Sequence, residues 1–398
     1  MSTFLGYPRA NGGAGVRNCV LVLPAIQCAN ELANRMAEQV EGTVPLLHNF
    51  SCGFLGLDQE RCRRSVIGLG ANPNVFAVLV VGLGCEPISA EYFAREINDA
   101  GGNAAWVSIS EEKTYEKALE EGVAVLRAFV EQASVIERVP CEASKLTIAV
   151  RCGGSGAVSA ISSNAATGSA ADRLIAAGAR VIFSETAELI GAESIVSKRV
   201  VSEEVAEKLC GKIRDMVKKI NDYGVDILGS EPSYGNIKQG LTTIEEKSMG
   251  AIAKTGTTPL VDVLEYAQAP TGGAGLYFMD GSSLSPLLYT GMMAAGAQIQ
   301  IHSYGGGLCA RSRNLSTYPS SIPMYPVIKI MGSTHDDCAI PYFDVFAGDI
   351  VRGTRSIHDV GQELYDEVLA VASGKATFTE REITYREMLQ FYADGLVM

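Results

Sequence analysis

The stretch VFAVLVVGLGCEP, from Val75 to Pro87, indicates the fold class. Its apolar part is rich in β-branched residues and ends in glycine, as expected of a strand buried on both faces of a parallel sheet. A second such run, CVLVLP at Cys19–Pro24, precedes it, and a segment with helical apolar spacing at 29–40 separates the two. The order of strand, helix and strand predicts a β-α-β unit.

The pattern continues through the chain in two series. After the first unit, the spacing predicts helices at 90–100 and 114–133 around a strand at 104–109. The polar stretch ERVPCEASK at 137–145 then ends the first series. The second series has predicted strands at 146–150, 180–184, 260–264, 297–302 and 327–330, with helices at 169–177 and 202–223. We therefore predict two Rossmann-like α/β domains with mostly parallel sheets, at residues 1–140 and 141–398.

Composition excludes several classes of function. The 398 residues include 33 Lys and Arg against 45 Asp and Glu, a net charge of −12, so the chain is a poor ligand for nucleic acids or anionic membranes. No apolar run approaches the roughly 20 residues that span a bilayer. The first residues lack a secretory signal pattern, which predicts a cytoplasmic protein whose ten cysteines are reduced thiols.

Several glycine-containing loops at strand ends carry chemically useful side chains. PLLHNFSCG at 45–53 contains His48 and Cys52, which either bind a borderline metal or are a hydrogen-bonded loop histidine and a small buried thiol. The loop GLGCE places Cys85 and Glu86 at the carboxyl end of a strand, and VRCGGS places Cys152 and Ser155 at another. Ligands of open α/β sheets bind beyond such ends.

Two further stretches combine acidic, basic and amide side chains. SETAE at 184–188 puts Glu185 and Glu188 three residues apart at a strand-to-helix junction, where they bind a cation, share acid/base work or complement a helix dipole. SYGNIKQGLTTIEEKSMGAIAK at 233–254 has a capping threonine before Glu245 and Glu246. The density of amide and charged groups in this second stretch is typical of a polyol or carboxylate site.

Taken together, the motifs resemble those of the altronate/galactarate dehydratase family of sugar-acid dehydratases. They are GVRN, HNFSCG, NPNV followed by VVGLGCE, CGGS, SETAELIGAE, GNIKQGLTTIEEKSMGAIAKTGTTP, GLYFMD and PVIKIMG. The resemblance implies a hydro-lyase that removes water from a hexonate or hexarate to give a 2-keto-3-deoxy acid, with a divalent metal, Fe²⁺ or Mn²⁺. In many members a small SAF-like β domain precedes this region. It is missing here, which implies a separate small subunit, and we also expect a homo-oligomer.

The resemblance also suggests roles for individual residues. The expected metal ligands are His48, Cys52, Cys85, Glu86, Cys152 and Glu185. The expected catalytic residues are His48, Lys247, Lys329 and Glu245, with a desolvated lysine as base. The expected substrate-binding residues are Arg17, Asn18, Ser155, Asn236, Thr242, Thr243 and Asp280.

The chain departs from the family pattern at four positions. Gly13, Gly156 and Gly306 stand where the family carries charged side chains, and Arg151 replaces a glutamate before CGGS. These departures predict a smaller 2-hydroxy acid as substrate. Three alternatives stay open: a two-subunit sulfo-lyase that releases sulfite from a sulfolactate-like acid, an iron–sulfur cluster on Cys52, Cys85 and Cys152, and a non-catalytic subunit that binds an acid.

Overall fold

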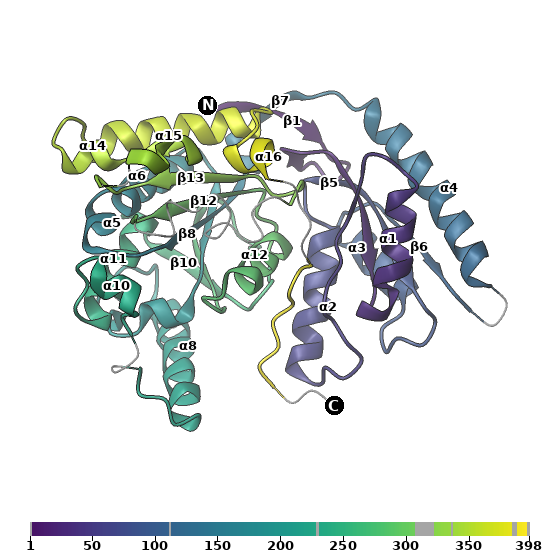
Figure 1. Cartoon of the computed structure of the whole chain (residues 1–398), viewed down its shortest axis with the longest axis horizontal. Coiled ribbons are helices and arrows are strands. Elements are labelled where there is room, and N and C mark those ends of the chain that lie inside the picture. The colour runs from purple at the N-terminus through teal and green to yellow at the C-terminus, as the bar shows by residue number, and fades with distance from the viewer. Residues whose placement is uncertain are drawn as a thin grey trace.

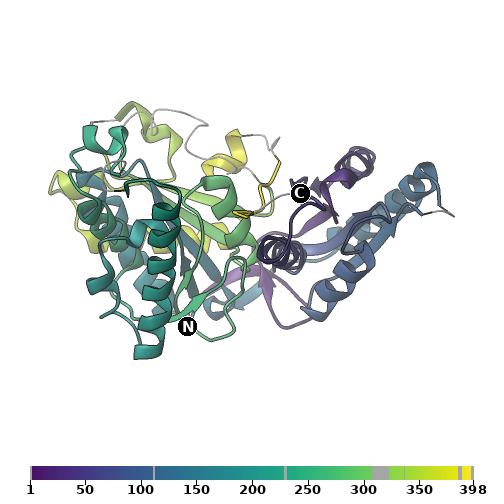
Figure 2. The same cartoon turned by 90° about the horizontal axis from the view of Figure 1, so that it is seen from below.

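The structure is a computed structural model that describes residues 2–110, 113–227, 231–306, 322–335, 337–383 and 388–395. It contains two parallel sheets, each covered by helices, which form two lobes that lie side by side (Figures 1 and 2). None of the helices in these ranges is long and apolar enough to cross a bilayer. The predicted fold class, α/β with mostly parallel sheets, is confirmed.

The first lobe has a four-stranded parallel sheet in the order β4-β3-β5-β6. Its strands are β3 (Cys19–Pro24), β4 (Thr43–Pro45), β5 (Val75–Gly82) and β6 (Ala104–Ser108). One face packs on α1 (Asn30–Glu38) and α4 (Tyr115–Ser134), and the other on α2 (Leu57–Gly70) and α3 (Ala90–Asp99). Because both faces are covered, the central strands are apolar along their whole length, as the sequence predicts.

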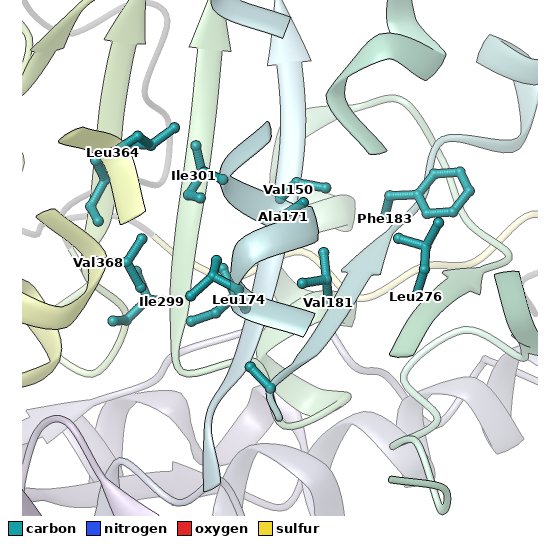
Figure 3. Packing of buried hydrophobic residues seen from close by; sticks show 14 of the residues in the cluster. Val150, Ala171, Leu174, Val181, Phe183, Leu276, Ile299, Ile301, Leu364 and Val368 are labelled. Carbon is teal, nitrogen blue, oxygen red and sulfur yellow. The ribbon is translucent and has the colours of Figure 1, made fainter. Parts of the chain in front are cut away.

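The second lobe has a seven-stranded sheet in the order β10-β11-β9-β8-β12-β13-β14, with every pair parallel. Its strands are β8 (Thr147–Gly153), β9 (Arg180–Phe183), β10 (Leu260–Leu264), β11 (Gly275–Met279), β12 (Ile299–Tyr304), β13 (Val327–Met331) and β14 (Val345–Phe346). Helices α6 (Ser163–Ala176) and α15 (Ile357–Ala372) cover one face (Figure 3). Helix α12 (Ser285–Ala294) covers the other and packs on α2 of the first lobe.

Further helices and a small sheet complete the fold. The α-helices are α5 (Ala157–Ile161), α7 (Glu193–Val196), α8 (Glu203–Asp222), α10 (Tyr234–Lys238), α11 (Ile244–Ile252), α14 (Gly348–Val351) and α16 (Phe378–Glu382). The 3-10 helices are η1 (Gln27–Ala29), η2 (Ala143–Lys145), η3 (Thr186–Leu189), η4 (Ala253–Thr255) and η5 (Asp337–Tyr342). A small antiparallel sheet of β1 (Thr3–Pro8), β2 (Ala14–Gly15) and β7 (Val139–Glu142) lies at the proposed division near residue 140.

The C-terminal segment returns to the first lobe and runs along α2 (Figure 1). Leu389 N donates to Leu47 O at 2.7 Å, and Asp394 pairs with Arg61 of α2 at 2.6 Å. The sequence did not predict this return, because no pattern in the segment indicates its partner. The two lobes are thus joined by the chain after residue 388 as well as by β7.

Candidate functional site

The carboxyl ends of the central strands in the seven-stranded sheet carry a group of buried polar residues. From β8 the chain moves to β9 on one side, and later it places β12 on the other side of β8. Such a reversal of strand order opens a crevice at the carboxyl ends, where open α/β sheets bind their ligands. Cys152 of β8 and Glu185, two residues after β9, lie at this edge.

Four side chains from three segments meet there. The Lys254 ammonium lies 2.6 Å from Glu188 Oε2, 3.4 Å from Glu185 Oε2 and 3.4 Å from Cys152 Sγ. Lys254 and Glu185 are each 2% exposed, as is Cys152. We name Cys152, Glu185, Glu188 and Lys254 the Lys254 cluster. It is a buried cation surrounded by three groups that are anionic when deprotonated.

Local structure fixes each member of the Lys254 cluster. Cys152 is the second-to-last residue of strand β8 and is buried there. Glu185 has a left-handed backbone with φ of 80°, a conformation that is unusual for a residue with a side chain. Because strained backbone is retained mainly where it positions a functional group, this conformation marks the β9 loop as part of the site. Lys254 lies on η4, directly after α11.

Burial and charge set the protonation of the cluster. Burial and the neighbouring Glu188 charge raise the pKa of Glu185 to about 8. Burial opposes ionisation of Glu188, but the Lys254 ammonium outweighs it and holds the pKa of that carboxyl below its usual value. Burial raises the pKa of Cys152 to about 12. Burial lowers the pKa of the Lys254 ammonium, but its interactions with Cys152, Glu188 and Glu185 outweigh burial and raise it. Of the three partners, Glu188 is the one that is ionised near pH 7.

The cluster also has the donor atoms of a metal site. One atom each of Cys152, Glu185 and Glu188 lies within 4.8 Å of the others, and no other such group of three occurs in the described parts of the chain. Thiolate and carboxylate donors suit a borderline divalent ion. The Lys254 ammonium contacts all three donors, so the site already holds one positive charge.

The structure does not bring the predicted ligands of the first lobe to this cluster. His48 is buried after β4, where Nε2 lies 2.7 Å from Pro24 O, Nδ1 accepts from Phe50 N, and the ring stacks on Phe391. Burial lowers the pKa of His48 to about 4. Both ring nitrogens are thus used by the backbone, and a metal-ligating or catalytic role for His48 has no support in this arrangement.

The cysteines and the glutamate of the first lobe are likewise separate. Cys52 and Cys85 are exposed, and Glu86 accepts hydrogen bonds from the backbone N–H groups of Leu83 and Cys85. Glu86 therefore organises its own loop. Cys152 belongs to the other lobe, and an iron–sulfur cluster on Cys52, Cys85 and Cys152 stays a prediction.

The predicted catalytic residues of the TTIEEK segment lie at the start of α11. Thr243 is the N-cap and accepts from Glu246 N, while Thr242 donates to Glu246 Oε2. Glu245 is exposed, and Lys247 is ion-paired with Glu231 at 2.5 Å. Capping therefore accounts for the threonines, and Lys247 has its own counter-charge.

The remaining predicted residues divide between structural and site-adjacent positions. Arg17 forms a two-pronged ion pair with Glu380, and Asn18 accepts from Arg9 and donates to Ala133 O. Both hold the lobes and the N-terminal strands together. Site-adjacent residues are Ser155, 4.0 Å from Cys152 Sγ, Asn236, which donates to Ser155 O, and Asp280, which accepts from Thr186 Oγ1. Lys329, on β13, is fully buried, and burial lowers its pKa to about 8.

Sequence reasoning missed Lys254, Arg151 and His302. Lys254 stands eleven residues after the N-cap Thr243 of its motif and is buried on η4, and only the fold shows what it faces. Arg151 donates to Ser285 Oγ at 2.7 Å and lies 3.4 Å from Glu185 Oε1. Glu185 therefore contacts two cations, Arg151 through Oε1 and Lys254 through Oε2. The spacing of Glu185 and Glu188 was the available signal for the cluster.

These features define an α/β protein with a buried acid, thiol and amine site at the carboxyl edge of its larger sheet. Family models described as "D-galactarate/Altronate dehydratase, C-terminal" and "D-galactarate dehydratase/Altronate hydrolase, second domain" match residues 143–394 and 6–134. The chain therefore belongs to the galactarate/altronate dehydratase family.

The chain is similar both to a sulfo-lyase subunit and to sugar-acid dehydratases. The chain is 33% identical to the (2R)-sulfolactate sulfo-lyase subunit beta of Chromohalobacter salexigens, over 95% of this chain and 94% of that one. It is 30% identical to the altronate dehydratase of Bacillus subtilis, over 98% of this chain and 77% of that one. It is also 30% identical to the galactarate dehydratase of Escherichia coli, over 98% of this chain and 76% of that one.

Proposed function

We propose that this protein is a lyase that eliminates water from a small 2,3-dihydroxy acid and yields a 2-keto-3-deoxy acid. The observation that carries the proposal is the Lys254 cluster, because it puts a proton-carrying amine beside two carboxylates and a thiol at the ligand-binding edge of the sheet. Membership of a dehydratase family supports the same class of reaction.

The donor set fits a divalent metal, for which we propose Fe²⁺, with Mn²⁺ as the other choice. The ligands of the ion would be Cys152, Glu185 and Glu188. In the structure the Lys254 ammonium contacts the same three side chains. When bound, such an ion supplies Lewis-acid stabilisation of the negative charge that develops on the substrate carboxylate.

Lys254 is the proton-transfer group in this proposal. Its ammonium is paired with the Glu188 carboxylate at 2.6 Å. A divalent ion held by Cys152, Glu185 and Glu188 would compete for that carboxylate and so would favour the free amine. The free amine then takes the proton from the carbon next to the carboxylate. The same amine returns that proton to the departing hydroxide, so water leaves and the enol product becomes the keto acid.

One observation favours a second candidate reaction, sulfite release from a sulfolactate-like acid. The match to the sulfo-lyase subunit covers 94% of that protein, whereas the dehydratase matches cover 76–77%. The elimination needs the same base and differs in its leaving group. The name of that relative as a subunit also supports our proposal of a separate small SAF-like partner, while the homo-oligomer and the cytoplasmic location stay predictions.

A panel of acids tests the proposal. Protein prepared without oxygen and supplied with Fe²⁺ is assayed on altronate, galactarate, tartrates and sulfolactate for keto acid and for sulfite. We expect the highest turnover on one of the smaller acids, because Gly156 and Gly306, which follow the carboxyl ends of β8 and β12, offer no charged side chain to a long polyhydroxy acid. Gly13 lies in the turn between β1 and β2, away from this edge of the sheet. Efficient turnover of altronate or galactarate would contradict the substrate assignment. Binding of an acid without any product would contradict the lyase function.

A further inference from the structure

A cavity of about 470 Å³ lies where α6, the end of η4 and the start of α15 meet. It is lined by one face of α6, by Ala253, Gly256 and Thr257 around η4, and by Ile357 and His358 of α15. None of these described lining residues belongs to the Lys254 cluster, so the cavity is distinct from the candidate site. Its size suits a small molecule. We name it the α6 cavity.

Arg173 of α6 brings a positive charge to the α6 cavity without a counter-charge. Its Nη2 donates to His358 O at 3.4 Å, and its buried Nε has no acceptor. Within the described ranges of the chain, no carboxylate oxygen lies within 4.0 Å of its guanidinium nitrogens. A charged donor that is buried without an acceptor destabilises the folded protein unless a ligand supplies that acceptor.

The first turn of α15 adds further hydrogen-bond donors. The N–H groups at the start of a helix have no acceptor within it, and they carry partial positive charge. In α15 they include those of Ile357 and His358, and both residues line the cavity. The N-cap residue Ser356 accepts from Asp359 N, the next donor along the helix. Because Arg173 donates to His358 O, the guanidinium and the start of α15 lie next to each other.

Two carboxylates of neighbouring residues are already bound elsewhere. Asp172, which also lines the cavity, accepts from the N–H and hydroxyl groups of Thr257 and Thr258. Asp359, in the first turn of α15, accepts from N and Oγ of Ser356. Neither carboxylate pairs with the guanidinium of the cavity, so an external anion is the partner that this group lacks.

From this arrangement we propose that the α6 cavity binds a phosphate group, either free or on a small ester. A phosphate offers several acceptor oxygens, which suit a guanidinium together with helix N–H groups. Ser169 and His358, whose side chains can also donate hydrogen bonds, line the same cavity. The inference goes beyond the proposed function, because the ligand is not the substrate and the site lies outside the Lys254 cluster.

The α6 cavity is placed to act on Lys254 through the backbone. Lys254 lies between Ala253 and Gly256, which both line the cavity. A Cβ at Gly168 of α6 would lie 2.2 Å from Ala253 O and 2.7 Å from Gly256 N, so α6 and η4 are in direct backbone contact. A phosphate that joins α6 to α15 beside this contact should make η4 more rigid, and with it the residue of the proposed proton transfer.

Calorimetry on the full-length protein tests the site with inorganic phosphate and glycerol 3-phosphate, against acetate at equal ionic strength. We expect the two phosphates to bind at least tenfold more tightly than acetate. Tighter binding of glycerol 3-phosphate than of phosphate would assign an ester as the ligand, and the reverse order would assign the free ion. No binding of either phosphate, or equally tight binding of acetate, would overturn the proposal.

Two substitutions in α6 locate the binding. Arg173→Met removes the unpaired charge and should weaken phosphate binding at least tenfold. Ala176→Glu puts a carboxylate one helical turn after Arg173, at an exposed position, where it competes with phosphate and should weaken binding to a similar extent. Ala176→Gln has the same size without the charge and should bind as the wild type does. Unchanged affinity in both Arg173→Met and Ala176→Glu would place the phosphate elsewhere and overturn the proposal.

Arg95→Met controls for net charge, because Arg95 is an exposed arginine of the first lobe. It should keep its phosphate affinity, and equal losses in Arg95→Met and Arg173→Met would refute the site. Hydrogen exchange of the amides at 253–258 should slow at least twofold with phosphate in the wild type and not in Arg173→Met. Phosphate binding without this slowing would contradict the coupling to η4. Since neither measurement uses turnover, the phosphate site can stand where the lyase function fails, and the reverse.

Discussion

Replacing Lys254 by methionine tests the cluster at the centre of the proposed site. The substitution keeps the buried volume but removes the cation that contacts Glu185, Glu188 and Cys152. Breaking a buried ion pair by removing one partner costs about 3–5 kcal/mol. For a domain of this size, 1 kcal/mol corresponds to about 2–4 °C, so we expect the melting temperature to fall by about 10 °C at pH 7.

The loss should depend on pH with a defined sign. The folded-state pKa of Glu188 is depressed by Lys254, so this stabilisation is complete above the ordinary carboxyl value of 4.5 and is lost as pH falls through the folded-state value. The difference between Lys254→Met and the wild type should therefore be largest at pH 7 and shrink below pH 4.5. A divalent ion should restore part of the stability of the variant, because it replaces the missing charge.

Thermal melts followed by circular dichroism measure both effects. Lys247→Met is the control, since Lys247 belongs to the same segment but forms a partly exposed ion pair with Glu231, and such pairs contribute about 1 kcal/mol or less. Equal melting temperatures for Lys254→Met and the wild type at pH 7 would refute the electrostatic reasoning. A loss that is the same at pH 7 and pH 4 would do so as well.

Three further predictions concern neighbouring features. Titration with Co²⁺ should give a thiolate-to-metal charge-transfer band in the wild type, and its persistence in Cys152→Ser would show that the thiol is not a ligand. Burial lowers the pKa of His48 to about 4, so the folded protein should lose about 3 kcal/mol of stability as the pH falls from 6.5 to 4. His48→Phe should abolish this loss and retain turnover. An unchanged pH dependence of urea unfolding in the variant would argue against the prediction. Asp172 accepts from the N–H and hydroxyl groups of Thr257 and Thr258 just after η4, so Asp172→Ala should expose Lys254 to amine-reactive labelling, which mass spectrometry detects, whereas labelling as low as in wild type would mean that this contact does not position Lys254.

The strands of the two sheets were largely predictable, because a buried parallel strand is a continuous apolar run. Cys19–Pro24 and Val75–Gly82 are such runs and have the boundaries that the sequence indicates. The edge strand Leu260–Leu264 also has the predicted boundaries, although it contains Asp262. Helix α2 was not predicted, since its charged residues Asp58 and Arg61 are buried against Asp394. Such pairing depends on a segment more than three hundred residues away, and no local pattern reports it.

The candidate site was only partly predictable for a similar reason. Cys152 and Glu185 were recognisable from their positions at strand ends, where the fold places ligand sites. His48 stands at a comparable strand end, but in the first lobe, and its ring is used by Pro24 O and Phe50 N. Lys254 and His302 closely follow buried apolar residues in the sequence, Ala251–Ile252 and Ile301, where sequence alone does not distinguish a site residue from a packed one.

The most direct test of the account compares turnover in two variants on the acid that the panel identifies as the best substrate. Glu188→Gln alters the Lys254 cluster, whereas Cys52→Ser alters the exposed thiol of the first lobe. We predict that Glu188→Gln lowers kcat by about 10² to 10⁴, the range for impaired proton transfer, because it removes the carboxylate that pairs with the proton-transfer group Lys254. Cys52→Ser should stay within about twofold of wild type. Full activity in Glu188→Gln with loss of activity in Cys52→Ser would place the chemistry in the first lobe and contradict the account.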